Sequence, residues 1–149
     1  MSAEFAMKWL LRFIGITTIP AFLAAVMPQS WFAYLIHRVD PAIPVGLLVT
    51  YLGRILMALY AFVGLQCFIF ATDIRRYRPL IWILGVGSLA AALIGLIALF
   101  STVPPDQRTG FFWVVFGDFA EGLVQASLLV ILLFRIQYSS DKEGLGIRD

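Results

Sequence analysis

The run from residue 80 to residue 100 constrains the fold most, because it is almost wholly apolar and has no charged side chain. About 20 mostly apolar residues are enough for a helix to cross the hydrocarbon core of a bilayer. Pro79 stands where the first turn of a helix tolerates proline, and Pro104 and Pro105 follow the other end. The run therefore predicts a transmembrane helix over 80–100.

Three other apolar segments are long enough to cross, and they occupy residues 8–27, 47–72 and 111–134. Pro20 predicts a bend in the first of them, because proline cannot donate a backbone hydrogen bond. A signal peptide is the competing interpretation of this segment, since Lys8 and Arg12 precede its apolar part. No small-x-small cleavage site follows, however, and the apolar run is long for a signal. We expect four spans.

Composition leads to the same conclusion. Of the 149 residues, 61% are apolar and only 13% are charged, and the mean hydropathy is +0.91. A soluble domain has about half of its residues apolar and about a quarter charged. A globule of this size could not bury the additional apolar residues, because small domains have much surface for their volume. The net charge of +2 is too small and too scattered to indicate nucleic acid. The lipid bilayer is the predicted partner.

The expected fold is all-α: an integral membrane four-helix bundle over residues 1–137, with a short interfacial amphipathic helix between the first and second spans. Short connections after the second and third spans predict that sequential neighbours pack antiparallel. Residues 138–149 are polar and contain glycine, which predicts a disordered cytoplasmic tail.

The connector between the first two spans, residues 28–46, has an amphipathic pattern. Ser30 stands where it could cap a short helix. Four residues would share one side of that helix: Trp31, Tyr34, Leu35 and Arg38. Because Trp and Tyr favour the bilayer interface, the connector should lie flat on the membrane as an anchor rather than bind a ligand.

Lys and Arg are divided unequally between the two sides that four spans define. Eight of the 11 belong to the side of both termini and the second connection: Lys8, Arg12, Arg75, Arg76, Arg78, Arg135, Lys142 and Arg148. The other side has Arg38, Arg54 and Arg108. Cytoplasmic flanks carry the positive excess, which predicts that both termini lie in the cytoplasm. Arg75, Arg76 and Arg78 should touch anionic lipid head groups.

Three ionisable residues, Arg54, Asp118 and Glu121, fall inside predicted spans. Such residues cost about 2.5–3.5 kcal/mol each to insert at mid-helix, so they are functional candidates by default. A rise of 1.5 Å per residue places Arg54 about 26 Å, Asp118 about 24 Å and Glu121 about 20 Å from the cytoplasmic ends of their helices. These similar depths predict an intramembrane charge cluster, which Gln125 joins on the same helical face as the carboxylates.

Two interpretations of this cluster stay open. In the structural one, which is favoured, Arg54 pairs with a carboxylate and fixes the packing of the second and fourth helices, while charges near the surface reach water by snorkelling. In the functional one, the carboxylate that a single Arg leaves unneutralised serves a proton, a cation or another ligand.

Several kinds of chemistry are excluded. His37 is the only histidine and Cys67 the only cysteine, so bis-His haem ligation, a His-based metal cluster and an intrachain disulfide are ruled out. Phosphate-binding loops and nucleophile motifs are absent from the sequence. We expect no enzymatic activity, no cofactor and no metal. A small-xxx-small face, formed by Gly87, Ala91 and Gly95, predicts close helix packing within the chain or with a second copy.

The second helix and the segment after it resemble small uncharacterised four-helix bacterial inner-membrane proteins of the DoxX-like group. The resemblance is carried by GRILMALYA at residues 53–61, Gly64, and DIRRYRPL at residues 73–80. Some DoxX-type proteins are membrane subunits of quinone-linked redox complexes, which the resemblance implies as one role for this chain. It transfers no catalytic residue.

The function predicted first is a non-enzymatic membrane subunit or accessory protein that acts through helix contacts, in a homo-oligomer or a larger complex. The alternatives are a small ion- or proton-coupled transporter that uses Asp118 or Glu121, and a quinone-linked subunit, which rests on fold analogy alone. A cavity that reaches Glu121 would favour transport, whereas a dry and fully paired cluster would favour a structural role.

Overall fold

The computed structural model describes the backbone of residues 3–144 and the side chains of residues 3–138. Its helices are α1 (Ala3–Thr18), α2 (Ala21–Val26), α3 (Gln29–Val39), α4 (Leu47–Thr72), α5 (Ile74–Thr102), the short 3₁₀ helix η1 (Pro105–Gln107) and α6 (Gly110–Gly144). The described part of the chain contains no strand. The predicted all-α fold class is therefore confirmed.

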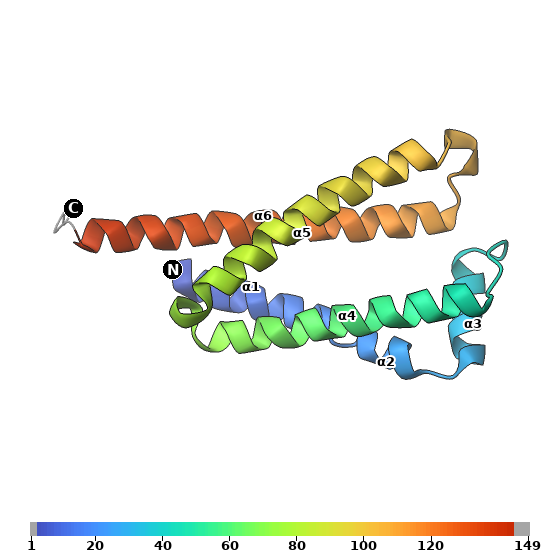
Figure 1. Cartoon of the computed structure of the whole chain (residues 1–149), viewed down its shortest axis with the longest axis horizontal. Helices are drawn as coiled ribbons and strands as arrows, with labels where there is room; N and C mark the ends of the chain where they lie inside the picture. Colours follow the sequence, from blue (N-terminus) through green and yellow to red (C-terminus); the bar gives the residue numbers. More distant parts are fainter. Residues whose placement is uncertain (1–2, 145–149) are drawn as a thin grey trace.

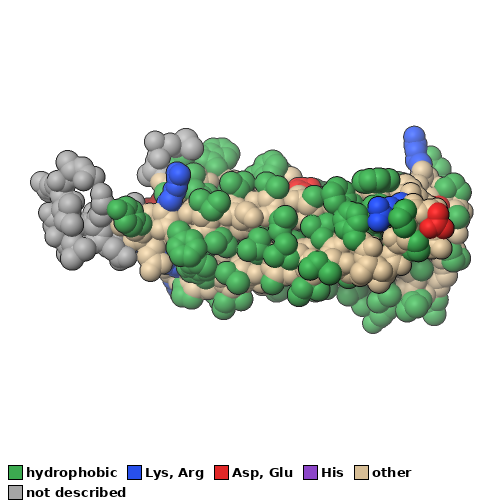
Figure 2. All heavy atoms as spheres, turned by 90° about the horizontal axis from the view of Figure 1, so that it is seen from above, with side chains coloured by type: hydrophobic (Ala, Val, Ile, Leu, Met, Phe, Trp, Pro, Cys, Tyr) green, Lys and Arg blue, Asp and Glu red, His purple; other side chains and the backbone are tan. Residues whose placement is uncertain are grey.

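Four stretches are long and apolar enough to span a membrane: Ala3–Val26, Leu47–Thr72, Ile74–Thr102 and Gly110–Tyr138. Large hydrophobic side chains stay exposed along all four stretches, and Figure 2 shows them over most of one face of the molecule. A soluble protein rarely exposes contiguous apolar surface on this scale. The chain is a multi-pass membrane protein.

The first span is broken where the sequence predicts a bend. α1 ends at Thr18 and α2 begins at Ala21, with Pro20 at its N-cap position (Figure 1). The hydroxyl of Thr18 donates to the carbonyl of Ile14 at 2.7 Å, and the amide of Ile19 donates to the carbonyl of Gly15 at 3.0 Å. The carbonyls of Ile14 and Gly15 therefore have donors just before the break, where Pro20 has no amide to offer.

The predicted connector helix is α3, but Ser30 does not cap it. The helix begins at Gln29, and Pro28 occupies the N-cap position without a side-chain hydrogen bond. Proline is tolerated at this place because the amide of an N-cap residue makes no intrahelical bond. Trp31 and Tyr34 are exposed on one side, while Phe32 is buried on the other and its ring lies against Gly53 of α4.

α5 begins earlier than the sequence analysis places it. The carboxylate of Asp73 accepts a hydrogen bond from the amide of Arg76 at 3.1 Å, which is the geometry of an N-cap. Residues 74–78, predicted to form a loop, are therefore the first turns of α5, and Pro79 lies inside the helix. A single residue, Asp73, separates α4 from α5.

The last helix, α6, also extends further towards the C-terminus than the sequence predicts. α6 continues to Gly144, so residues 138–144 are helical rather than disordered. The remaining part of the predicted tail, residues 145–149, lies outside the described residues.

The helices form two pairs rather than one evenly packed bundle. α1 and α2 lie along α4, α5 lies along α6, and α1 joins the pairs by packing against α6 (Figure 1). α4 and α5 touch little although a short connection joins them, so of the two short connections only the one between α5 and α6 joins spans that pack along each other. The most deeply buried large side chains form one core, to which α1, α4, α5 and α6 all contribute: Met7, Leu11, Cys67, Ile81 and Leu133.

The two pairs meet again at the opposite end of the molecule, which we call the distal end and define by Asp40 and Thr109. The hydroxyl of Thr109 and the amide of Ala42 both donate to the carboxylate of Asp40, and they hold the pKa of Asp40 below its ordinary value. A β-carbon on Gly110 would lie 2.9 Å from the carbonyl oxygen of Val39, so the end of α3 and the start of α6 approach closely here. The space between the pairs is thus bounded at both ends.

Candidate intramembrane site

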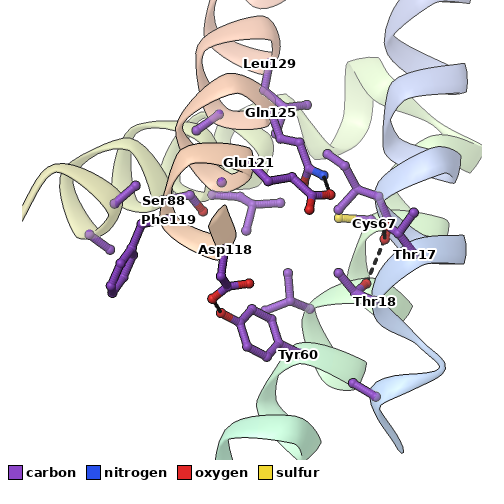
Figure 3. A pocket seen from close by; sticks show the side chains of 18 of the residues that line it. Thr17, Thr18, Tyr60, Cys67, Ser88, Asp118, Phe119, Glu121, Gln125 and Leu129 are labelled. Carbon is purple, nitrogen blue, oxygen red and sulfur yellow. Dashed lines mark hydrogen bonds between the residues drawn. The ribbon is translucent and has the colours of Figure 1, made fainter. Parts of the chain in front are cut away.

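A cavity of about 590 Å³ lies between the two helix pairs, and all four spans contribute to its wall (Figure 3). It is open on part of its boundary, because both Asp118 and Glu121 are exposed. Figure 2 shows acidic atoms about halfway along the molecule, surrounded by hydrophobic side chains. The cavity therefore lies within the membrane-spanning part of the fold.

One face of α6 supplies the charged part of the wall. Asp118, Glu121 and Gln125 line the cavity at intervals of three and four residues, together with the small residues Gly122 and Ala126. The Nε2 of Gln125 donates to Oε1 of Glu121 at 2.7 Å. The spacing in the sequence predicts that these residues share a face, and the structure turns this face towards α1 and α4 (Figure 3).

Tyr60 of α4 is a member of the site that the sequence analysis does not single out. Its hydroxyl donates to Oδ2 of Asp118 at 2.5 Å, across the cavity from α6 (Figure 3). A tyrosine inside a span usually finds a polar partner for its hydroxyl. That tendency was the available signal, but it does not say which partner the hydroxyl meets.

Arg54 does not belong to the cluster, and the predicted ion pair is wrong. Its Nη2 donates to the carbonyl oxygen of Met27 at 2.9 Å, and Arg54 is not part of the cavity wall. Among the described residues no ion pair within 4.0 Å joins it to Asp118 or Glu121. The depth estimate compared positions along the helices but could not show which groups lie nearby.

The carbonyl of Met27 explains the position of the Arg54 guanidinium group. Met27 is the C-cap of α2, its backbone is extended, and Pro28 follows it. The last carbonyls of a helix have no intrahelical partner and attract cations. Arg54 also lies six residues before Tyr60, which moves it about 9 Å along α4 and away from the carboxylates.

Hydroxyl and thiol groups complete the polar part of the wall. α1 supplies Thr17 and Thr18, α4 supplies Cys67 and α5 supplies Ser88. The hydroxyls of both threonines donate to a carbonyl of α1, so their protons are used within the helix. No sequence pattern separates these residues from the many small polar residues of ordinary membrane helices.

The rest of the wall is apolar. It includes Met57 and Val63 of α4, Leu84 of α5, and Phe119 of α6. The ring of Phe119 also packs directly on Gly95 of α5, so the predicted small-residue face serves helix packing at this position.

The charge of the wall is one-sided. Its residues include two carboxylates but no lysine, arginine or histidine. In a low-dielectric surrounding an ionised carboxylate without a cation is costly. The arrangement therefore favours a proton or another cation in the cavity, and it disfavours an anion.

The other predicted interface residues lie at the ends of the spans. Arg75 donates to Glu4 at 2.9 Å and so links the first turn of α5 to that of α1. Arg76 lies over the ring of Tyr77, and Nη2 of Arg78 is buried without a hydrogen-bond partner in the described part of the chain.

Fold and site together define a multi-pass all-α membrane protein with an acidic cavity between its helix pairs. No family model, curated protein or solved structure matches the chain. The resemblance to DoxX-like proteins therefore stays a prediction.

Proposed function

We propose that this protein is a small proton-coupled cation transporter of the cell membrane, in which Asp118 and Glu121 hold the transported cation and the exchanged proton in turn. The observation that carries the proposal is the cavity: both carboxylates face it, and no basic side chain in its wall neutralises them. An accessory subunit is the function predicted first from the sequence. The favoured interpretation of the cluster there pairs Arg54 with a carboxylate, and a cavity that reaches Glu121 would favour transport instead. Without that pair, the transporter is the better supported function.

The hydrogen bonds at the two carboxylates fit this role. Tyr60 donates to one oxygen of Asp118, and Gln125 donates to one oxygen of Glu121. In the described part of the chain the second oxygen of each carboxylate has no protein donor. Each carboxylate is therefore oriented by one bond and has another oxygen for a proton or a cation.

The coupling follows from electrostatics. An ionised carboxylate within the membrane is unfavourable unless a positive charge neutralises it. When a cation leaves the cavity, a proton must replace it, and when a cation binds, that proton must be released. Competition for the same oxygens therefore couples the two movements without any other charged residue.

The test uses proteoliposomes that are acidic inside and contain a pH-sensitive dye. At least one class of external monovalent cation, alkali metal ions or quaternary ammonium ions, should release the internal protons through the wild-type protein. Quaternary ions carry no proton of their own, so they cannot collapse the gradient as free amines do. The double variant Asp118→Asn/Glu121→Gln should be inactive, whereas Asp106→Asn, which removes a carboxylate from η1, should behave like the wild type. Failure of every cation to move protons would contradict the proposal.

An accessory subunit is the second candidate, and one observation favours it. A β-carbon added to Gly87 of α5 would meet no atom within 4 Å, so the described part of the chain does not cover this part of the small-residue face. Such faces pack against other membrane helices. Purification in mild detergent from the native membrane tests this role: a stoichiometric partner that is lost on Gly87→Leu substitution would support it.

We also propose that both termini lie in the cytoplasm of a bacterial cell. The support is the excess of Lys and Arg on the side of the termini and of the α4–α5 connection. In this orientation the distal end of the molecule faces the outside.

A further inference from the structure

We propose that the ligand of the cavity is an amphiphilic organic cation, such as a quaternary ammonium or phosphonium ion with apolar substituents, which enters sideways from the bilayer. This inference rests on the proposed function and names its substrate class. It is carried by the size of the cavity, by the chemistry of its wall and by the position of its opening.

The size of the cavity excludes a bare inorganic ion as the ligand that fills it. A volume of about 590 Å³ is typical of pockets for organic ligands, which range from about 300 to 1,000 Å³. An inorganic cation needs oxygen ligands on all sides, at about 2.3–2.6 Å for a calcium-sized ion. Among the described residues no group of three or more His, Cys, Asp or Glu side chains could hold a metal ion.

The wall has two kinds of surface that match two parts of one molecule. The carboxylates of Asp118 and Glu121 lie on the α6 side and suit a positive charge. Aromatic and aliphatic side chains, among them Phe119, Met57 and Leu84, suit apolar substituents. The ring of Tyr60 can also attract a cation through its face. A hydrophilic cation would leave this apolar surface without a partner.

The opening of the cavity faces the lipid rather than the water on the terminal side. At that side the α1–α6 junction is filled by fully buried residues such as Leu11 and Leu133. At the distal end, Asp40 and Thr109 join the two helix pairs. Along the middle, α4 and α6 hardly touch, yet Asp118 and Glu121 are exposed. A cation that dissolves in the bilayer can therefore reach the carboxylates directly between these helices.

The test measures equilibrium binding of radiolabelled tetraphenylphosphonium to the purified full-length protein in detergent. We expect saturable binding that tightens as the pH rises, because protons compete for the carboxylates. Asp118→Asn/Glu121→Gln should weaken binding at least 10-fold, and Asp106→Asn should leave it unchanged. Triphenylphosphine oxide, which is similarly apolar but uncharged, should not compete, and neither should Na⁺ or K⁺ at the same concentration.

A pair of adjacent substitutions on α5 provides a control that keeps both carboxylates. Ser88→Phe places a ring in the cavity, because Ser88 lines its wall (Figure 3). Gly87→Phe adds the same ring at a position with no neighbour within 4 Å. We expect Ser88→Phe to abolish binding and Gly87→Phe to preserve it. Equal binding by the two variants would overturn the location of the ligand.

The outcomes separate this inference from the proposed function. If tetraphenylphosphonium does not bind saturably, while alkali metal ions still move protons in proteoliposomes, the organic ligand is wrong and the transporter stands. If no cation binds and none moves protons, both fail. If triphenylphosphine oxide competes as well as a cation does, the cavity binds apolar compounds without regard to charge, and the inference is likewise overturned.

Discussion

Tyr60 has the most specific role of any single residue in the site, because its hydroxyl bridges the gap between α4 and α6 to reach Asp118. We expect Tyr60→Phe to lower the free energy of unfolding by about 1 kcal/mol, the usual net value of such a bond. Thermal unfolding in detergent measures the change. Tyr51→Phe is the matched control on the same helix, since Tyr51 is exposed. An equal effect of the two substitutions would show that the bridge is not formed.

Arg54 gives a second prediction at this scale. Arg54→Ala leaves the Met27 carbonyl without its donor, which should lower stability by about 1–3 kcal/mol. Because Arg54 and Asp118 share no partner, the effects of Arg54→Ala and Asp118→Asn should add to within about 0.5 kcal/mol. A double-mutant cycle on thermal stability provides the measurement. If Asp118→Asn rescues Arg54→Ala, the two residues are paired after all.

Asp40 predicts a pH dependence of the distal junction. Its folded pKa is lower than the ordinary value of 3.8, because Thr109 and Ala42 donate to its carboxylate. A lowered pKa means that this contribution to stability is complete above pH 3.8 and is lost as the pH falls through the folded value. The difference in melting temperature between wild type and Thr109→Val should therefore be constant at neutral pH and shrink below about pH 3.8. A difference that grows on acidification would contradict this assignment.

At the scale of the element, glycine at helix crossings controls how closely α1 and α4 approach. A β-carbon on Gly15 would lie 3.0 Å from the carbonyl oxygen of Gly64, and one on Gly64 would collide with the hydroxyl of Thr18. The sequence pattern predicts close packing at the small-residue face of α5 instead. A regular spacing of small residues is visible in one helix, whereas the contact between Gly15 and Gly64 depends on two helices that lie far apart in sequence.

This crossing makes a prediction about stability. Gly64→Leu should lower the free energy of unfolding by about 3 kcal/mol, the upper end of what overpacking costs, because backbone atoms cannot move aside. Gly87→Leu, with open space around it, should change stability little in the isolated protein. Thermal unfolding of the two variants in detergent tests this. Equal stability would mean that α1 and α4 do not cross here.

The bounds of the elements were predictable where the signals are local. The span at residues 47–72 is correct at both ends, since Gly46 precedes it and Asp73 follows it. The sequence places the start of α5 too late, because Pro79 suits the first turn of a helix, although Asp73 is itself a good N-cap residue. A proline inside a helix is tolerated when neighbouring groups satisfy the carbonyl that it leaves without a donor.

At the scale of the whole molecule, hydrophobicity was enough to predict four membrane spans but not how they pair. The face of α6 that carries Asp118, Glu121 and Gln125 follows from helical periodicity alone. The partners of that face do not, because the arrangement of α1, α4 and α6 depends on contacts between distant segments. For this reason Arg54 was grouped with the carboxylates, and Tyr60, which does reach them, was not.

The orientation of the molecule predicts which positions react with a membrane-impermeant thiol reagent. In a Cys67→Ala background, Ser101→Cys at the distal end of α5 should be labelled in intact cells. Asp73→Cys in the α4–α5 connection should be labelled only after the membrane is permeabilised. Labelling of both positions from the outside would contradict the proposed topology.

The central claim is that Asp118 and Glu121 exchange a proton for a cation, and proton release measures this most directly. Purified protein in weakly buffered detergent is titrated with tetraphenylphosphonium, and in parallel with Na⁺ and K⁺, while a glass electrode follows the pH. The account predicts close to one proton released per organic cation bound by the wild type and by Asp106→Asn, and none by Asp118→Asn/Glu121→Gln. Binding without proton release, or equal release by the double variant, would contradict the claim that these carboxylates carry out the exchange.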